Sequence, residues 1–122
     1  MSNPSYAKVI KSFWTNWKSI GGDIKFGLVG FSAGIKIGNK RIPLQFIMND
    51  KVDLISDNYR ESYNISPTVY KVYTDKLKAE VPRAYDLVIA NHVALSFELI
   101  TESDLKSILD AAVLLAVEMK GA

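Results

Sequence analysis

The last twenty residues place the tightest constraint on the fold. Apolar residues there recur at spacings of three and four, which predicts a helix over residues 102–119. The recurring residues are Leu105, Ile108, Leu109, Ala112, Leu115, Ala116 and Met119. From Ala111 to Val117 every residue is apolar, so this helix needs cover on several sides. In a chain of 122 residues we expect part of that cover to come from a second copy. Thr101 and Asp104 have the spacing of a helix-capping pair.

A second amphipathic helix is predicted over residues 4–20. Its apolar stripe is rich in aromatic residues: Tyr6, Val9, Ile10, Phe13, Trp14, Trp17 and Ile20. Ser2 or Asn3 can cap its start, Pro4 suits its first turn, and Gly21 with Gly22 ends it.

Residues 24–100 are predicted to be mostly antiparallel sheet. We expect strands over residues 24–31 and 34–48, with a turn at 32–34, and a connection over 49–66 with a short helical turn. In the second strand Ile42, Leu44, Phe46 and Met48 alternate with more polar residues, which predicts one apolar face. Pro43 has no amide hydrogen, so this strand is either an edge strand or bulged there.

Further β-structure is expected after Pro67. The β-branched and aromatic residues of 68–78 predict a strand, residues 79–83 a turn, and residues 84–100 a long β-rich run. The fold class is therefore α+β: one domain over residues 1–122, with an antiparallel sheet between an N-terminal and a C-terminal helix.

Composition excludes several classes of function. Cysteine is absent, so disulfides, thiolate metal sites and thiol nucleophiles are impossible. The longest wholly apolar run is too short to cross a bilayer, and no apolar core follows the first basic residues. We therefore expect a soluble protein of intracellular origin with no membrane partner.

Residues 30–34 match the G-x-S-x-G pattern of a hydrolase nucleophile elbow. That motif requires a following helix, whereas Ile35-Lys36-Ile37 reads as strand, and His92 is the only histidine that could serve as a base. No other set of acid, base and nucleophile stands out, so we expect no enzymatic activity, no cofactor and no bound metal.

Charge is distributed unevenly along the chain. Residues 1–48 contain seven lysines and arginines against one acidic residue, whereas residues 49–122 contain eight against twelve. A basic half favours an anionic partner, above all nucleic acid. The candidate RNA-binding residues lie on or beside the predicted strands: Lys36, Lys40, Arg41 and Lys71 for phosphates, and Gln45, His92 and Ser96 for polar contacts. Lys25 lies beside the same strands, and Tyr70 and Tyr73 interleave with the later residues.

The C-terminal third resembles a known family. Residues 91–100 read Asn-His-Val-Ala-Leu-Ser-Phe-Glu-Leu-Ile, and Thr101-Glu102-Ser103-Asp104 then leads into the apolar helix from Leu105 to Met119. With residues 68–78 and the turn at Val81-Pro82 before it, this segment is similar to the coat proteins of single-stranded RNA bacteriophages. The resemblance implies a homodimer with one continuous antiparallel sheet, helices lying across the partner's sheet, RNA bound to the opposite face, and assembly into an icosahedral shell.

The leading hypothesis is accordingly a viral coat protein, made in the host cytoplasm and located in the virion, that encloses a single-stranded RNA genome. The first alternative is a cytosolic nucleic-acid-binding or regulatory module that forms no shell. A small-ligand carrier, with helix 4–20 lying over an apolar cavity, is the second alternative.

Overall fold

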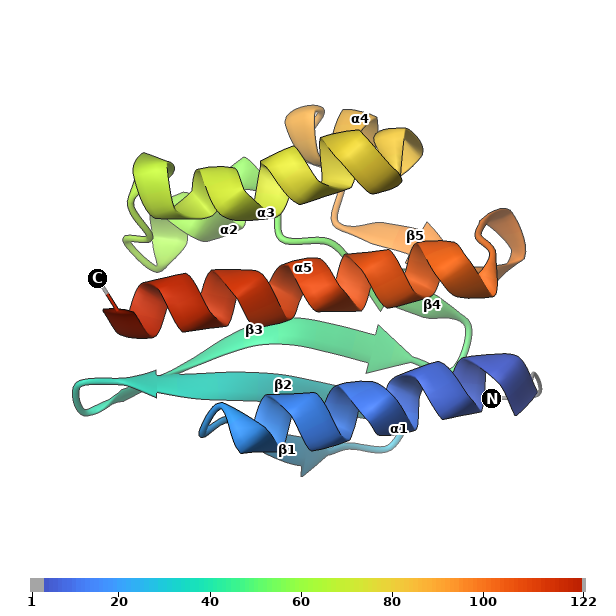
Figure 1. Cartoon of the computed structure of the whole chain (residues 1–122), viewed down its shortest axis with the longest axis horizontal. Helices are drawn as coiled ribbons and strands as arrows, with labels where there is room; N and C mark the ends of the chain where they lie inside the picture. The colour runs from blue at the N-terminus through green and yellow to red at the C-terminus, as the bar shows by residue number, and fades with distance from the viewer. Residues whose placement is uncertain (1–3, 122) are drawn as a thin grey trace.

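The computed structural model describes residues 4–121, which form a five-stranded antiparallel sheet and a layer of helices (Figure 1). The strands neighbour one another in chain order, β1-β2-β3-β4-β5. The predicted α+β class is confirmed, with an N-terminal helix, an antiparallel sheet and a C-terminal helix. The elements are α1 (Pro4–Ser19), β1 (Asp23–Phe26), β2 (Gly30–Ile37), β3 (Lys40–Met48), β4 (Lys51–Asp53), α2 (Asp57–Ser62), α3 (Pro67–Glu80), α4 (Pro82–Ile89), β5 (Ala94–Ser96), the 3₁₀ turn η1 (Phe97–Leu99) and α5 (Glu102–Gly121).

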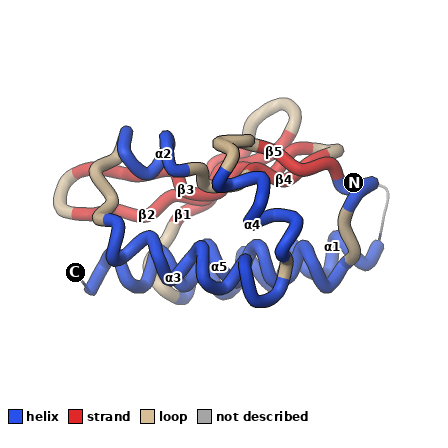
Figure 2. The backbone as a smooth tube through the Cα atoms, turned by 90° about the horizontal axis from the view of Figure 1, so that it is seen from above, coloured by secondary structure: helices blue, strands red, loops and turns tan. Residues whose placement is uncertain are grey.

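The helices are distributed unequally over the two faces of the sheet. Figure 2 shows α1, α3 and α5 side by side below the sheet, with only the short α2 above it. We call the side facing α1 and α5 the inner face and the opposite side the outer face. The inner face forms the core, and most of the outer face has no helix over it.

Helix α5 lies between α1 and α3 (Figure 1). The predicted capping pair is confirmed, because the Asp104 amide donates to Thr101 Oγ1 at 3.0 Å and the Thr101 amide donates to Asp104 Oδ2 at 3.1 Å. Within the apolar run, Leu115 is fully buried, whereas Leu114 and Val117 are 43% and 45% exposed. The single chain therefore buries one side of this helix and leaves Leu114 and Val117 of its apolar run partly exposed. Cover of that exposed side by a second copy stays a prediction.

Helix α1 is attached to the rest of the chain by polar atoms of its aromatic side chains. Trp17 is fully buried, and its Nε1 donates to the Gly34 carbonyl at 2.9 Å. The Tyr6 hydroxyl donates to the Ile100 carbonyl at 2.5 Å. The helix begins at Pro4 as predicted. The capping role predicted for Ser2 or Asn3 lies outside the described residues.

The predicted turn at residues 32–34 is wrong. These residues lie inside β2 and pair with both β1 and β3. The chain instead reverses at 27–29, between β1 and β2, and at Gly38 and Asn39, between β2 and β3. Gly38 has a φ of +63°, a conformation that glycine adopts without the strain of a Cβ atom.

Strand β3 is bulged next to Pro43. A bulge was one of the two arrangements predicted from the missing amide hydrogen of this proline. Ala33 pairs with Gln45 but Gly34 pairs with Pro43, so Leu44 is an extra residue in β3. The extra residue reverses the alternation of faces along the strand. The prediction that the apolar residues at 42, 44, 46 and 48 share one face is therefore wrong.

Residues 68–78 form a helix, not the predicted strand. Helix α3 begins with Pro67 in its first turn, and the Ser66 hydroxyl accepts from the Val69 amide at 3.1 Å. Tyr70 and Tyr73 point into the core, where the Tyr70 hydroxyl donates to the Ile55 carbonyl at 2.6 Å and the Tyr73 hydroxyl accepts from the Ile55 amide at 3.0 Å. These two bonds hold α3 against the segment that follows β4.

The long β-rich run predicted over 84–100 is also wrong. Residues 82–89 form α4, and only the three residues of β5 pair with the sheet. Within β5 the predicted alternation is confirmed: Leu95 is buried, and Ala94 and Ser96 lie on the other side. The stretch 49–66 contains the expected short helix as α2, together with the unpredicted strand β4. Segments that carried the resemblance to coat proteins therefore form helices rather than strands.

None of the helices within residues 4–121 is both long enough and apolar enough to cross a membrane.

Replacing Leu115 with Ala tests whether one chain is enough to shelter α5. Because Leu115 is fully buried, we expect Leu115→Ala to lower the free energy of unfolding by about 2–5 kcal/mol. The adjacent Leu114→Ala removes the same atoms from a half-exposed position and should cost less than about 1 kcal/mol. Urea denaturation followed by circular dichroism measures both values. Equal costs, or loss of an oligomer in Leu114→Ala alone, would show that a second copy covers the exposed side of α5.

Candidate nucleic-acid interface

The strand register defines which residues project from the outer face. Lys25, Ser32 and Phe46 are directly opposite one another on β1, β2 and β3. Because Ile47 pairs with the buried Val52 on the inner face, their neighbours along β3 and β4 project outward. The outward residues of the sheet are Asp23, Lys25, Ser32, Lys36, Arg41, Pro43, Phe46, Met48, Lys51, Asp53, Ala94 and Ser96.

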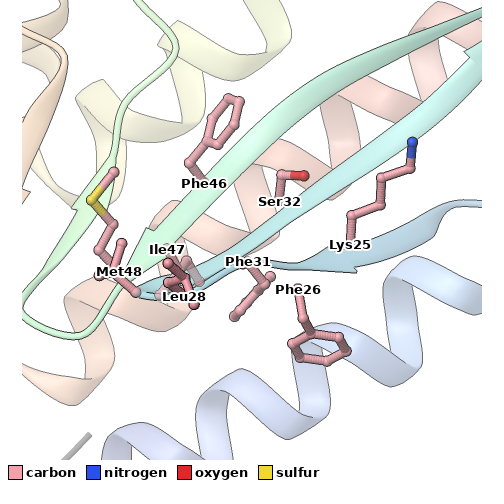
Figure 3. Close-up of a pocket in the computed structure, with 11 residues that line it drawn as sticks. Lys25, Phe26, Leu28, Phe31, Ser32, Phe46, Ile47 and Met48 are labelled. Atoms are coloured by element: carbon pink, nitrogen blue, oxygen red, sulfur yellow. The ribbon is translucent and has the colours of Figure 1, made fainter.

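Phe46 lies in the middle of this face and is half-buried. Figure 3 shows it on the same side of the sheet as Ser32 and Lys25, whereas Phe26 points toward α1. The ring of Phe26 lies edge-on to that of Trp14, with 5.5 Å between their centroids. Phe46 is thus an aromatic side chain of the sheet that the helical layer does not cover.

Two clefts meet at Phe46. The larger, of about 280 Å³, lies beside the β1–β2 turn and includes Lys25, Ser32 and Met48 (Figure 3). The smaller, of about 150 Å³, lies toward α2 and includes Asp53, Tyr59 and Val93, together with Leu44, Leu54 and Ile55. Phe46 lines both clefts, so its ring forms the ridge between them.

The cations of the outer face differ in whether they are paired. Arg41 donates to Asp23 Oδ1 at 2.6 Å and lies against Gly34, where a Cβ atom would collide with its guanidinium group. Lys25, Lys36 and Lys51 form no ion pair with any residue of 4–121. Of these three, Lys25 and Lys36 are exposed, so they can contact an anionic ligand without losing a partner.

The smaller cleft contains one carboxylate. Asp53 is half-buried, and burial raises the pKa of its carboxyl while the nearby Lys51 acts in the opposite direction. No side chain of the described part of the molecule donates a hydrogen bond to this carboxylate. The Tyr59 hydroxyl in the same cleft already donates to the Pro43 carbonyl. The Asp53 carboxylate therefore accepts no side-chain hydrogen bond within residues 4–121, and it lies near Lys51 at the edge of an otherwise mostly apolar cleft.

Of the residues predicted to bind RNA, Lys36, Arg41 and Ser96 lie on the outer face. Ser96 Oγ already accepts from the Glu98 amide at 3.2 Å. Lys40 lies at the β2–β3 hairpin end, where its Nζ is 5.2 Å from the centre of the Tyr63 ring.

The other three predicted residues lie elsewhere. Gln45 is fully buried because of the bulge, and its Nε2 donates to the Asp53 carbonyl at 2.7 Å, so its role is to join β3 to β4. Lys71 is on α3, in the helical layer, and pairs with Asp75 at 2.6 Å. His92 lies in the exposed turn between α4 and β5. The structure therefore does not place Gln45 and Lys71 on one surface with the residues of the outer face.

Sequence reasoning missed Phe46, Lys51 and Asp53 as members of the site. The period of two along the strand predicts that Phe46 lies on the same apolar face as Ile42. Lys51 and Asp53 lie in a three-residue strand, too short to produce a recognisable pattern. Pro43 was the one signal in the sequence that could have revealed the site. A bulge at this proline moves the side chains of the following residues in the strand to the opposite face of the sheet.

The chain matches no family model, and comparison with curated proteins and with solved structures gave no similar protein.

The half-buried carboxyl of Asp53 predicts a pH-dependent change in stability. Burial raises the folded-state pKa of Asp53 above its ordinary value of 3.8, so this group favours the folded state at low pH, and the benefit is lost as pH rises through the raised pKa. Asp53→Asn is uncharged at every pH. We therefore expect it to gain stability relative to the native protein at pH 7 and to gain less at pH 4.

Urea denaturation at the two pH values measures this difference. Asp86→Asn, which neutralises an exposed carboxyl on α4, is the control and should change stability little. If the stability gained by Asp53→Asn grows as the pH falls, the folded-state pKa of Asp53 is not raised by burial.

Proposed function

We propose that this protein binds single-stranded RNA on the outer face of its sheet. The observation that carries the proposal is Phe46, a half-buried aromatic ring on the face opposite the helical layer. It lies between two clefts on a face edged with lysines that form no ion pair within residues 4–121. The helical layer lies on the opposite side, so a ligand can reach this face without displacing any of α1, α3 or α5 (Figure 2).

The chemistry of the face suits a single strand. Unpaired bases can stack on an exposed aromatic ring, which contributes about 1–3 kcal/mol per base. Phosphates alternate with bases along the strand, and Lys25 and Lys36 project from the same face as Phe46. A duplex would hide the base faces and leave the Phe46 ring without a stacking partner.

The volumes of the clefts give less support to a small-ligand carrier. The cleft between α1 and the sheet, where a carrier would hold its ligand, has a volume of about 270 Å³, and the two clefts at Phe46 have about 280 and 150 Å³. All three are below the roughly 300–1,000 Å³ of pockets that enclose a drug-sized ligand. The two clefts at Phe46 are open surface clefts on either side of its ring, which suits an extended polymer better than an enclosed molecule.

Substitution of Phe46 tests the stacking contact. We expect Phe46→Ala to weaken binding of a labelled single-stranded RNA about 5- to 150-fold, which corresponds to about 1–3 kcal/mol of lost stacking. Fluorescence anisotropy measures the dissociation constant, and circular dichroism shows whether the variant is folded. Unchanged affinity in a folded variant would remove the basis of the proposal.

The lysines are tested by salt dependence. The double variant Lys25→Ala, Lys36→Ala should bind more weakly and lower the slope of log K against log salt by about 1.4, since each phosphate contact contributes about 0.7 for a single strand. The matched control is Lys71→Ala, Lys106→Ala, which removes the same charge from ion-paired positions on α3 and α5. An equal loss in both double variants would indicate attraction by net charge alone.

Assembly of the protein into an icosahedral coat remains a prediction from sequence, as does the continuous sheet of a dimer. Gel filtration and negative-stain microscopy of the expressed chain separate the two hypotheses. Uniform hollow particles that contain RNA would support a coat protein. A monomer or dimer that binds RNA without forming particles would support the alternative of a binding module.

A further inference from the structure

The side chains that line the smaller cleft bear on which RNA base could bind there. This step rests on the proposed function. Among the residues that line the cleft, Asp53 supplies the only charged side chain, and Tyr59 has its hydroxyl proton engaged by the Pro43 carbonyl. The remaining side chains, from Leu44, Leu54, Ile55 and Val93, are apolar, and Phe46 forms the ridge.

A carboxylate is an acceptor only, with two oxygens that can receive parallel hydrogen bonds. It therefore selects for a ligand edge that presents two adjacent donors. Among the four RNA bases only guanine has such an edge, where N1–H and the N2 amino group stand side by side. Cytosine and adenine offer an amino group beside an acceptor, and uracil offers N3–H between two carbonyls.

The cleft also disfavours the other parts of a nucleotide. A phosphate placed there would meet the negative charge of Asp53, and the apolar walls offer it no hydrogen bond. With a volume of about 150 Å³, the cleft has room for the edge of a base whose face rests on the Phe46 ring. The phosphates can then lie toward the larger cleft, where Lys25 and Ser32 project.

We infer that the Asp53 cleft binds the Watson–Crick edge of an unpaired guanine, so the protein prefers single strands that contain this base. In a duplex the same edge is occupied by cytosine, so pairing removes the preference together with the stacking contact. Asp53 is a specificity determinant, and Phe46 with the lysines supplies the general affinity.

The test compares three short RNAs in anisotropy titrations at one salt concentration. One contains only uridine, one carries a single central guanosine, and one carries inosine at that position, which keeps N1–H but lacks the 2-amino group. We expect the guanosine strand to bind at least about fivefold more tightly than the uridine strand. The inosine strand should lie between them.

Asp53→Asn keeps the shape of the side chain but replaces one acceptor with a donor, so the preference should disappear while the uridine strand still binds. Asp23→Asn is the matched control: it removes the same charge from the same face, where Asp23 is paired with Arg41. It should strengthen binding of all three strands and leave their order unchanged.

The possible failures are distinguishable. If none of the three strands binds, the proposed function itself is wrong. If all bind but guanosine has no advantage, or if Asp53→Asn keeps that advantage, RNA binding stands and the assignment of the Asp53 cleft is overturned.

Discussion

The structure depends on the burial of α5 between the sheet and two other helices. Leu105, Ile108 and Leu115 are completely shielded from solvent, and α1 and α3 pack on either side of the helix that carries them. Placing three helices on one face leaves the other face with little cover in a chain of this length. The open outer face is therefore a consequence of the packing of α5, and the candidate site exists because of it.

The aromatic residues of the helices hold this layer in position through their polar atoms. Trp17 reaches the Gly34 carbonyl in β2, and Tyr70 and Tyr73 together satisfy both backbone groups of Ile55. These bonds lie where the sheet is irregular, next to the β3 bulge and after β4, and there the backbone lacks regular ladder partners. Burial raises the pKa of both tyrosine hydroxyls, so they remain protonated and available as hydrogen-bonding groups.

How much of the fold could be predicted from the sequence depended on how many residues each hydrophobic pattern spans. Helices α1 and α5 were predictable because their periodicity extends over many residues. The strand content of residues 24–48 was also predicted, but the turns that divide it into β1, β2 and β3 were misplaced. Helix α3 was misread because its valines and tyrosines favour strands in isolation, a preference that tertiary packing overrode. The contrary signals were present: Ser66 and Pro67 form a helix start, and Tyr70, Tyr73 and Leu77 follow a helical spacing. The prediction of strands over residues 68–78 and 84–100 gave β-propensity more weight than the helix-start signals.

The candidate site was harder to predict than the fold because a single residue decides which side chains belong to it. Without the extra Leu44 in β3, Gln45 would share the outer face with Arg41, as the sequence suggested, and Phe46 would lie in the core. The bulge instead buries Gln45, whose amide then joins β3 to β4, and places Phe46 on the outer face between the clefts. A long apolar strand next to unpaired lysines thereby becomes a surface suited to stacking and phosphate contact rather than a second core layer. The proline that prevents a regular ladder at this point is thus the local cause of both the structural role of Gln45 and the proposed binding role of Phe46.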